Sequence, residues 1–507
     1  MLAKVLSYGL AGLNGFLVTV EADVVNGMPG YETVGLPDAA VKESRERVRA
    51  AIRHSGAPYP VAHITVNLAP ADQRKEGTLY DLPIALAVLI ASGLLKPLPQ
   101  DAIVLGELAL DGTVRPVSGV LPMLIDAYHN GYSAFFVPKE NAAEAAYIEG
   151  ARVFPVGSLA ELLGFLRGES QIEPMPTQRF FGEHGQAVFD FSEIKGQTAA
   201  KRAAEVAVAG AHNMLLCGTP GSGKTMLARA IPSILPEMTF EEALEVTKIH
   251  SVTGAMKGTQ GLITTRPFRA PHHGASASAL IGGGTKAMPG EISLAHNGVL
   301  FLDEFPEFAR DVLESLRQPL EDGEVTVSRA AATATYPARF MLIAAMNPCP
   351  CGNRGSRTKP CTCTQTAIRR YASRISGPLL DRIDLHIEMT EVGYREITDR
   401  RPAESSETIR ARVVQARSMQ AERFKSDGIR TNAQMNSALI KRYCSPAGES
   451  ERMLREAYQK LQLSARAYQR VLKVARTIAD LDGSETILPQ HYAEAIQYRS
   501  MDLLKNL

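Results

Sequence analysis

One short segment of the chain has the residue types and the spacing needed to hold the phosphates of a nucleotide. It reads Gly218-Thr-Pro-Gly-Ser-Gly-Lys224-Thr225 and lies between an apolar, strand-like run and a helix-like run. The glycines would let backbone N–H groups surround the phosphates, and the helix would direct its positive end toward them. We predict that Lys224 reaches the β- and γ-phosphates of ATP and that the Thr225 hydroxyl holds Mg²⁺. The predicted ATP-binding residues are Gly218, Thr219, Pro220, Gly221, Ser222, Gly223, Lys224, Thr225 and, from the next motif, Asp303.

A second apolar run ends in two acidic residues. In Gly298-Val-Leu-Phe-Leu-Asp303-Glu304 the acids follow a strand of the kind that is buried in a parallel sheet, at its carboxyl end. Taken alone, such a pair is more typical of a solvated turn. In a chain with a phosphate-binding loop, it predicts that Asp303 positions Mg²⁺ through water and that Glu304 acts as the general base.

Two further residues are candidates for catalysis. A third apolar run, at 340–346, ends in Asn347, whose amide could orient water or sense the γ-phosphate; an ordinary strand-end cap is the alternative. Arg382 lies in Gly377-Pro-Leu-Leu-Asp-Arg-Ile-Asp384. A guanidinium group suits the charge of a phosphoryl-transfer transition state, as arginine fingers do. A local ion pair with Asp381 or Asp384 is the alternative.

Four cysteines form two closely spaced pairs, Cys349-Pro-Cys351 and Cys361-Thr-Cys363. Four thiolates can complete a tetrahedral Zn²⁺ site and stabilise a short loop with little core of its own. Each pair has one intervening residue, which is tighter than the common two to four. Four free surface thiols are the alternative, but they would oxidise readily, so zinc is favoured. Four protein ligands leave no position for water, so the predicted site is structural.

The composition describes the protein that must position these groups. Its 507 residues suggest roughly three domains. Apolar residues make up 45% and charged residues 21%, as in soluble globular proteins. The net charge is only +1, so binding to nucleic acid would need a local basic patch. The sequence shows neither a membrane-length apolar run nor a signal peptide, so we expect a cytoplasmic protein without membrane contacts.

The pattern of apolar residues predicts an α/β fold in four segments. Residues 1–168 alternate strands and helices, with a strand at 61–67 and a buried helix at 81–95. Residues 169–189 are polar, contain two prolines and are expected to form a linker. Residues 190–391 form the predicted P-loop core with a parallel sheet and include the cysteine loop at 349–363. Residues 392–507 are expected to be a helical lid.

Several motifs resemble a known family. Arg266-Pro-Phe-Arg-Ala-Pro-His-His273, Gly282-Gly-Gly and Pro289-Gly-Glu-Ile-Ser-Leu-Ala-His-Asn-Gly298 resemble the magnesium-chelatase-like AAA+ ATPases. Asn347-Pro-Cys-Pro-Cys-Gly352 and Arg374-Ile-Ser-Gly-Pro-Leu-Leu-Asp-Arg-Ile-Asp384 narrow the resemblance to the YifB/ComM family, over essentially the whole chain. The resemblance implies a homohexameric ring with ATP sites shared between subunits. It also implies that Arg382 is a finger for the neighbour's site and that Arg466 is a nucleotide-sensing arginine of the lid, for which a solvated helix face is the alternative.

The same family is similar to MCM-type helicases in two loops that would face the channel of a ring. These are a helix-2 insertion at roughly 250–290 and a β-hairpin from Gly323 to Pro337. Lys286 in the insertion and Arg329 at the hairpin are candidate DNA contacts through phosphate charge, with plain surface charge as the alternative. For the adjacent His272 and His273, a structural role in the insertion is favoured over metal binding.

Residues 1–168 resemble the proteolytic domain of Lon and the related domain of RadA. The likeness lies in Val104-Leu-Gly-Glu-Leu-Ala-Leu-Asp-Gly-Thr-Val-Arg-Pro-Val-Ser-Gly119 and Phe136-Val-Pro-Lys-Glu-Asn141. Leu79 and Leu121 occupy the positions of the Lon nucleophile and its lysine, and neither can do that chemistry. We therefore expect no protease activity but a role in ring assembly or DNA gripping. A possible basic face comprises Arg45, Arg47, Arg49 and Arg53, although an ordinary solvated helix face is the safer interpretation.

The first functional hypothesis is a hexameric, ATP-driven DNA motor. It would promote branch migration or unwinding of branched or single-stranded DNA in recombination and natural transformation. Its predicted catalytic residues are Lys224, Glu304, Asn347, Arg382 and Arg466. The alternative is a chelatase-type ATPase that remodels a protein or a porphyrin-metallating partner. A scaffold with an inactive ATPase is disfavoured, because the catalytic set is intact.

Overall fold

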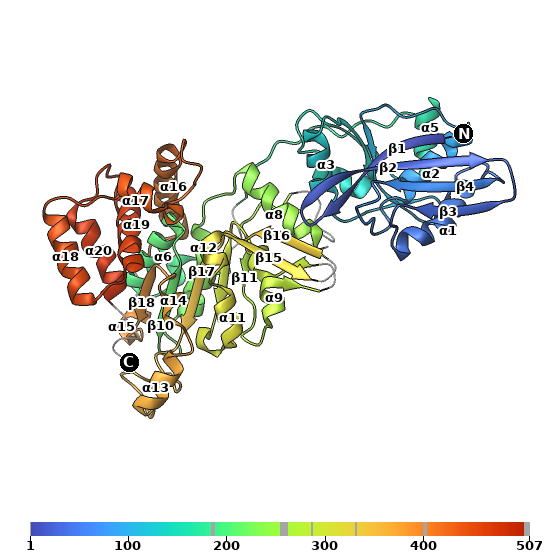
Figure 1. The fold of residues 1–507 in the computed structure, drawn as a ribbon. Helices are drawn as coiled ribbons and strands as arrows, with labels where there is room; N and C mark the ends of the chain where they lie inside the picture. Colours follow the sequence, from blue (N-terminus) through green and yellow to red (C-terminus); the bar gives the residue numbers. More distant parts are fainter. Residues whose placement is uncertain are drawn as a thin grey trace. The chain divides into compact units, whose positions relative to one another are not determined.

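The computed structural model describes residues 2–183, 188–253, 262–284, 287–329, 332–398 and 403–500 (Figure 1). The chain divides into two compact units, and each is considered by itself. The first unit comprises Met1–Phe181 with Ala243–Ile263, and the second comprises Gly182–Glu242 with Thr264–Leu507. Within the described part of the chain, no helix combines the length and the apolar character needed to cross a membrane.

The first unit is built on a seven-stranded mixed sheet in the order β3-β4-β2-β1-β5-β8-β9. β2 is antiparallel to both β1 and β4, and the other neighbours in the sheet run parallel. The strands are β1 (Leu2–Ala11), β2 (Asn14–Val25), β3 (Gly30–Val34), β4 (His63–Ala69), β5 (Ala102–Val104), β8 (Ala134–Pro138) and β9 (Arg152–Val156). The strand predicted at 61–67 is therefore confirmed as β4.

Helix α2 (Asp81–Ala91) forms the centre of this unit. Every one of its residues is buried, as expected for a helix that is apolar on all sides. It confirms the buried helix predicted from residue 81 onward. The other main helices are α1 (Ala39–His54), α3 (Val120–His129) and α5 (Leu159–Arg167). Leu79 packs against this core, and Leu121 is fully buried in α3.

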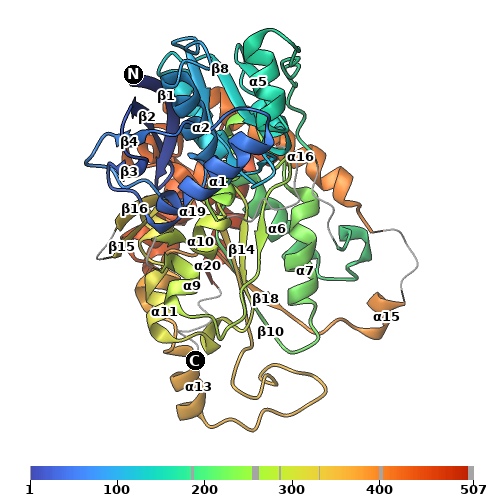
Figure 2. The same ribbon diagram turned by 90° about the vertical axis from the view of Figure 1, so that its right-hand side faces the viewer.

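The second unit contains a five-stranded parallel sheet in the order β11-β14-β17-β10-β18. The strands are β10 (Met214–Gly218), β11 (Phe268–Arg269), β14 (Val299–Leu302), β17 (Met341–Met346) and β18 (Leu385–Met389). Figure 2 shows β10, β14 and β18 with helix α7 (Lys224–Ala230) beside them. All residues of β10, β14 and β17 are buried, which explains why these runs are continuously apolar. The predicted α/β class with a parallel sheet is confirmed.

The helices that follow the sheet share its hydrophobic core. They are α16 (Ser406–Arg423), α17 (Ser437–Tyr443), α18 (Glu449–Leu461), α19 (Ala465–Leu481) and α20 (Pro489–Ser500). Ile409 of α16 and Val471 of α19 belong to the same buried cluster as Leu216 of β10. The helical region is therefore packed directly against the sheet.

A two-stranded hairpin lies between β14 and β17 in the sequence. β15 (Glu324–Arg329) pairs antiparallel with β16 (Ala332–Pro337). The hairpin occupies the segment in which the resemblance placed one. Val325 and Val327 on one face of β15 are buried, and Thr326 and Ser328 on the other face are exposed.

Candidate functional site

The predicted phosphate loop joins the carboxyl end of β10 to the start of α7. Gly221 and Gly223 have φ angles of +81° and +92°, which favour glycine. At Gly218, a Cβ atom would lie 2.4 Å from the carbonyl oxygen of Met389, so the close approach of the two strands also requires glycine. The motif therefore has both the backbone freedom and the packing that it needs to curl around an anion.

Lys224 folds back onto this loop. Its Nζ donates hydrogen bonds to the carbonyl oxygens of Gly218 at 2.7 Å and Thr219 at 3.0 Å, and to Oδ1 of Asn347 at 3.3 Å. Burial lowers the pKa of Lys224 below its ordinary value. The strand-end Asn347 thus lies within reach of the lysine, as expected for a residue that senses the same phosphate.

Two polar atoms of the loop are suited to a phosphate ligand. The hydroxyl groups of Thr219 and Ser222 are buried and have no hydrogen-bond partner among the described residues. Buried hydroxyls without partners are uncommon, because an unmade hydrogen bond costs free energy. Phosphoryl oxygens would supply the missing acceptors and would also draw Lys224 away from the backbone carbonyls. The loop therefore fits the triphosphate of ATP.

The predicted magnesium ligands are in direct contact. The Thr225 hydroxyl donates to Oδ2 of Asp303 at 2.8 Å, although the two residues are far apart in the sequence. The second carboxylate oxygen of Asp303 accepts from the backbone N–H of Glu304 at 2.9 Å. Oxygen ligands of this kind match the preference of Mg²⁺, which keeps several waters and takes few protein ligands. The pair therefore fits a magnesium ion beside the phosphates.

Glu304 has a partner that sequence reasoning missed. Nδ1 of His273 lies 2.9 Å from Oε2 of Glu304, and the rings of His272 and His273 are 4.0 Å apart. Glu304 itself has a φ angle of +51°, which is rare for a residue with a side chain. β11 and β14 are neighbours in the sheet, so the segments that follow them meet. The sequence spacing alone does not relate residues 273 and 304. Their contact could be anticipated only from the pairing of the two strands that precede them.

Arg382 lies at the opposite end of the sheet. It is 6% exposed, donates to the carbonyl oxygen of Pro378 at 2.8 Å and is paired with Glu321. The sequence offered Asp381 or Asp384 as an alternative partner for Arg382. In the structure, Arg382 pairs with Glu321 instead. The hydrogen bond from Arg382 lowers the pKa of Glu321. Arg466, on α19, donates to the other oxygen of Glu321 at 3.3 Å.

Asp384 anchors the same edge. Burial would raise its pKa, yet Arg470 and His212 hold the pKa of Asp384 well below its usual range. Its Oδ2 accepts from the backbone N–H of Asn213 at 2.8 Å, and the Asn213 side chain donates to the carbonyl oxygen of Arg382 at 3.1 Å. Asn213 directly precedes β10, so this network fixes Arg382 at the amino edge of the sheet.

The predicted site residues, catalytic and magnesium-binding, therefore form two groups in one chain. Lys224, Thr225, Asp303 and Asn347 meet at the carboxyl edge, whereas Arg382 and Arg466 meet at the amino edge. The five residues of β10 separate the edges by roughly 13 Å at about 3.3 Å per residue.

The four cysteines converge after Asn347. Sγ of Cys349 lies 3.4 Å from that of Cys351 and 3.6 Å from that of Cys361, and all four sulfur atoms lie within 4.8 Å of one another. Four thiolates about 2.3 Å from one Zn²⁺ ion would be separated by about 3.8 Å, so the cluster has the dimensions of such a site. The backbone N–H of Cys351 also points to Sγ of Cys363 at 3.4 Å.

The cysteine loop packs against the phosphate loop. A Cβ atom at Gly352 would lie 2.7 Å from the ring of Pro220, so the backbone of Gly352 packs closely against the Pro220 side chain. Gly352 has a φ of +78°, which allows the chain to turn at this point. The cysteine cluster is therefore placed to hold Asn347 and Pro220 in position.

The residues predicted to contact DNA lie only partly within the described residues. Lys286 lies outside the described residues. Arg329 is the last residue of β15 and faces Ala332 across the hairpin, and its side chain lies outside the described part. On α1, the predicted basic face is divided: Arg45 and Arg53 are exposed, whereas Arg47 turns inward to Asp81 at 2.6 Å. Arg47 therefore contributes to the fold of the first unit and not to a free surface.

Matches to known protein families cover most of the chain. A family profile described as magnesium chelatase, subunit ChlI, matches residues 190–397. Profiles described as subunit ChlI of Mg-chelatase and as the C-terminal part of subunit ChlI match residues 20–141 and 403–499. The first match contains both the phosphate loop and the cysteine cluster.

Individual relatives extend over nearly the full length. The uncharacterized protein YifB of Escherichia coli is 46% identical over 498 residues, which are 97% of this chain and 96% of YifB. The competence protein ComM of Haemophilus influenzae is 45% identical over 514 residues, with 99% and 98% of the two chains covered. The DNA repair protein RadA of Haemophilus influenzae is 32% identical over 160 residues, which are 31% of this chain and 33% of RadA.

Proposed function

This chain belongs to the YifB/ComM family of magnesium-chelatase-like AAA+ ATPases, and from that premise we propose that it is a ring-forming motor that uses ATP hydrolysis to move DNA strands. The likeness to a competence protein and to a DNA repair protein supports DNA as the substrate. The specific activity proposed is branch migration or unwinding of branched or single-stranded DNA in recombination and natural transformation.

The observation that carries the proposed ring is the division of the catalytic set between two edges of one sheet. Arg382 and Arg466 converge on Glu321, away from the phosphate loop of the same chain. A guanidinium group that contributes to phosphoryl transfer must contact the reacting phosphate. The phosphate it contacts is therefore that of a neighbouring copy, and repeating this head-to-tail contact closes a ring, here proposed to be a homohexamer.

The proposed reaction is hydrolysis of the bond between the β- and γ-phosphates. Lys224 and the backbone of the phosphate loop would hold the triphosphate, while Thr225 directly and Asp303 through water would hold the metal ion. Glu304 accepts a proton from a water molecule, whose oxygen attacks the γ-phosphorus. The bond to the bridging oxygen then breaks, and ADP and phosphate leave. Asn347 orients the water, and Arg382 and Arg466 of the neighbour stabilise the charge on the transferred group. Bound magnesium would neutralise charge on the phosphate oxygens.

The proposed base, Glu304, already has a neighbour at its carboxylate group. In the structure one carboxylate oxygen faces His273 at 2.9 Å. That contact occupies one of the two oxygens that could accept the proton from water. We therefore assign His273 to the control of Glu304, in place of the purely structural role expected from the sequence.

We also propose that Cys349, Cys351, Cys361 and Cys363 bind a structural Zn²⁺ ion. The test is metal analysis of the purified protein together with titration of its thiols. One zinc per chain is expected, and its removal should expose four additional reactive thiols. The control is Cys444→Ala, a buried cysteine outside the cluster, which should keep the zinc. Zinc far below one per chain, with all four thiols freely titratable, would contradict the assignment.

The proposed function is tested by the ATPase rate in the presence of single-stranded, duplex and four-way-junction DNA, beside a branch-migration assay. Stimulation by DNA and movement of strands are expected. The Arg329→Ala and Lys286→Ala variants should bind DNA more weakly and with a smaller salt dependence. ATPase activity without DNA stimulation or strand movement would favour the second candidate, a chelatase-type remodelling ATPase, to which the magnesium-chelatase profiles lend support.

A further inference from the structure

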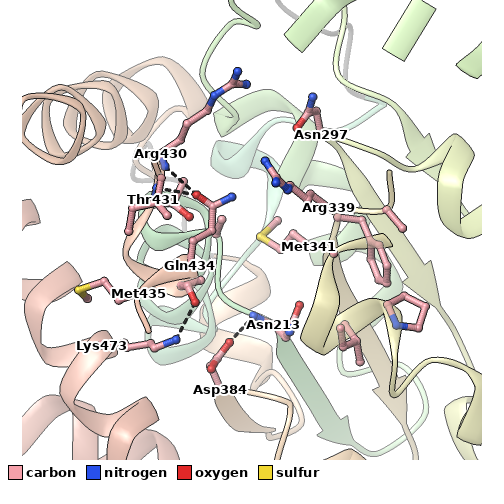
Figure 3. Close-up of a pocket in the computed structure, with 18 of the residues that line it drawn as sticks. Asn213, Asn297, Arg339, Met341, Asp384, Arg430, Thr431, Gln434, Met435 and Lys473 are labelled. Atoms are coloured by element: carbon pink, nitrogen blue, oxygen red, sulfur yellow. Dashed lines mark hydrogen bonds between the residues drawn. The ribbon is translucent and has the colours of Figure 1, made fainter. Parts of the chain in front are cut away.

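A cavity of about 510 Å³ opens at the amino edge of the parallel sheet, at the opposite end of β10 from the phosphate loop (Figure 3). Its walls come from the residues that flank the β15–β16 hairpin, from the segment between α16 and α17, and from α19. This volume lies in the range of small-molecule sites, roughly 300–1,000 Å³.

Among the charged side chains that line the cavity, basic ones outnumber acidic ones. The lining includes six cationic side chains, those of Arg266, Arg339, Arg417, Arg430, Arg470 and Lys473. The four acidic side chains of the lining are those of Glu242, Glu321, Asp322 and Asp384. Of these, Glu321 already contacts Arg382 and Arg466, which lie outside the lining. Positive charge is therefore in excess at this edge.

Half of the six cations are already held by carboxylates. Arg266 and Arg430 share Glu242, at 2.6 Å and 3.5 Å, and Arg470 is paired with Asp384. These ion pairs connect the helical region to the sheet. The charges of the other three cations are not balanced by these carboxylates.

Arg339, Arg417 and Lys473 have no carboxylate within ion-pair distance among the described residues. Arg417 donates to the carbonyl oxygen of Val208 at 2.8 Å, and Lys473 donates to that of Ala433 at 2.8 Å. The Arg339 side chain is exposed. In Figure 3, Arg339 extends from the loop after β16 and Lys473 from α19, both toward the space between these elements.

Arg417 and Lys473 are partly buried, and burial makes their protonated forms less favourable than in water. Burial lowers the pKa of Lys473 to about 8, and the positive charge of Arg470 adds to the effect. Burial also lowers the pKa of Arg417, with a further contribution from Arg266. A bound anion would offset both effects, because it places negative charge beside partly desolvated cations.

Neutral donors complete the lining. The hydroxyl of Thr431, a residue that is 5% exposed, is buried without a hydrogen-bond partner among the described residues. Oε1 of Gln434 accepts from the backbone N–H groups of Arg430 at 2.7 Å and Thr431 at 3.2 Å, so its NH₂ group remains as a donor. A phosphoryl oxygen in the cavity would supply the acceptor that this hydroxyl lacks.

We propose that this cavity binds a phosphate-bearing anion of about nucleotide size, with Arg339, Arg417 and Lys473 as its charged contacts and Thr431 as a neutral one. Guanidinium groups bind phosphoryl oxygens through paired hydrogen bonds, and an ammonium group adds a compact charge. The anion is either free, as a nucleotide or pyrophosphate, or a phosphodiester group of a DNA strand held near the hairpin. The proposal goes beyond ATP hydrolysis, because none of its residues belongs to the phosphate loop.

The test uses the full chain with Lys224→Ala, which weakens anion binding at the phosphate loop. Calorimetric titrations with pyrophosphate and, separately, with a single-stranded oligonucleotide are compared before and after Arg339→Gln and Lys473→Met are added. About tenfold weaker binding is expected for each cation removed, since hydrogen bonds to charged groups are strong. As a matched control, Lys425→Met removes an exposed cation and should leave both affinities unchanged.

Each outcome decides the proposal. Weaker pyrophosphate binding identifies a free anion as the ligand, and an effect confined to the oligonucleotide identifies the phosphodiester. If neither probe binds, or if both bind equally well in all variants, the proposal is overturned. Arg339→Gln alone keeps the test valid if Lys473→Met unfolds, because the Arg339 side chain is exposed.

A pH series provides an independent readout. The groups that face Lys473 are Asp384, Arg470 and Cys444, together with the carbonyl oxygen of Ala433. As the pH rises through about 8, Lys473 loses its proton, so anion affinity should fall several-fold. This fall should disappear in the Lys473→Met variant. An affinity that depends on pH in the same way with and without Lys473 would exclude this lysine as a contact.

Discussion

The two edges of the parallel sheet differ in how their charged groups are satisfied. At the carboxyl edge, Lys224 is bonded to the carbonyl oxygens of its own loop and to Asn347, and Thr225 is bonded to Asp303. At the amino edge, Arg382 and Arg466 share a single carboxylate, that of Glu321. The groups of the first edge fit a phosphate and a metal ion, whereas at the second edge a buried arginine and an exposed one are paired with a single acid.

On the proposed assignment, one chain contains all the catalytic residues but no complete catalytic site of its own. Both groups are held by the same buried strands, so they do not reach each other by side-chain rotation. In the proposed ring, head-to-tail contact would bring the amino edge of one copy to the carboxyl edge of the next.

The largest effect is expected at the amino edge. Arg382→Ala should lower kcat for ATP hydrolysis by about a thousandfold or more, because an arginine finger contributes on that order. ATP binding should change little, since the phosphate loop is intact. The measurements are steady-state ATPase rates and equilibrium binding of ATP.

The control separates catalysis from folding. Glu321→Gln removes the charge that holds Arg382 but keeps the guanidinium group. It should reduce kcat far less than Arg382→Ala does. Equal losses in the two variants would show that Arg382 acts only through its pair with Glu321.

At the carboxyl edge, Glu304→Gln should lower kcat by about a hundredfold or more and leave ATP binding intact, because a general base typically contributes 10²–10⁴-fold. Rapid-quench measurement of a single turnover locates the loss in the chemical step. Full hydrolysis in this variant would show that another group takes the proton.

The carboxyl edge was predictable from the sequence because its residues lie in contiguous motifs. Each motif can be recognised separately, because one strand is followed by Gly218–Thr225 and another by Asp303. Parallel strands then bring these strand ends together. The amino edge was not. Arg382 and Glu321 are 61 positions apart, and Arg466 and Glu321 are 145 positions apart, with no spacing rule that relates them. The excess charge around Lys473 is likewise assembled from distant segments and becomes visible only in three dimensions.

The cysteine loop should have an intermediate effect. Replacing Cys351 by serine, or removing the metal with a chelator, should lower kcat about tenfold, because the loop packs against Pro220 and follows Asn347, and small displacements of catalytic groups are costly. Cys444→Ala is the matched control and should leave kcat unchanged. If metal-free protein keeps full activity, the loop does not position the phosphate site.

The smallest effect is expected at His273. Its replacement by alanine should raise the basal ATPase rate a few-fold, because the net value of one hydrogen bond is about 0.5–1.5 kcal/mol. Stimulation by DNA should shrink correspondingly if DNA binding normally frees Glu304. A lower basal rate would mean that His273 assists Glu304 and does not restrain it.

In the proposed ring, the amino edge of one copy completes the carboxyl edge of the next. This arrangement is tested most directly by mixing Arg382→Ala chains with Lys224→Ala chains, each inactive alone. Mixed assemblies contain interfaces that pair an intact phosphate loop with an intact Arg382, so partial recovery of ATP hydrolysis is predicted, with a maximum near equal proportions. Mixtures that form assemblies but remain inactive at every ratio would contradict the shared site.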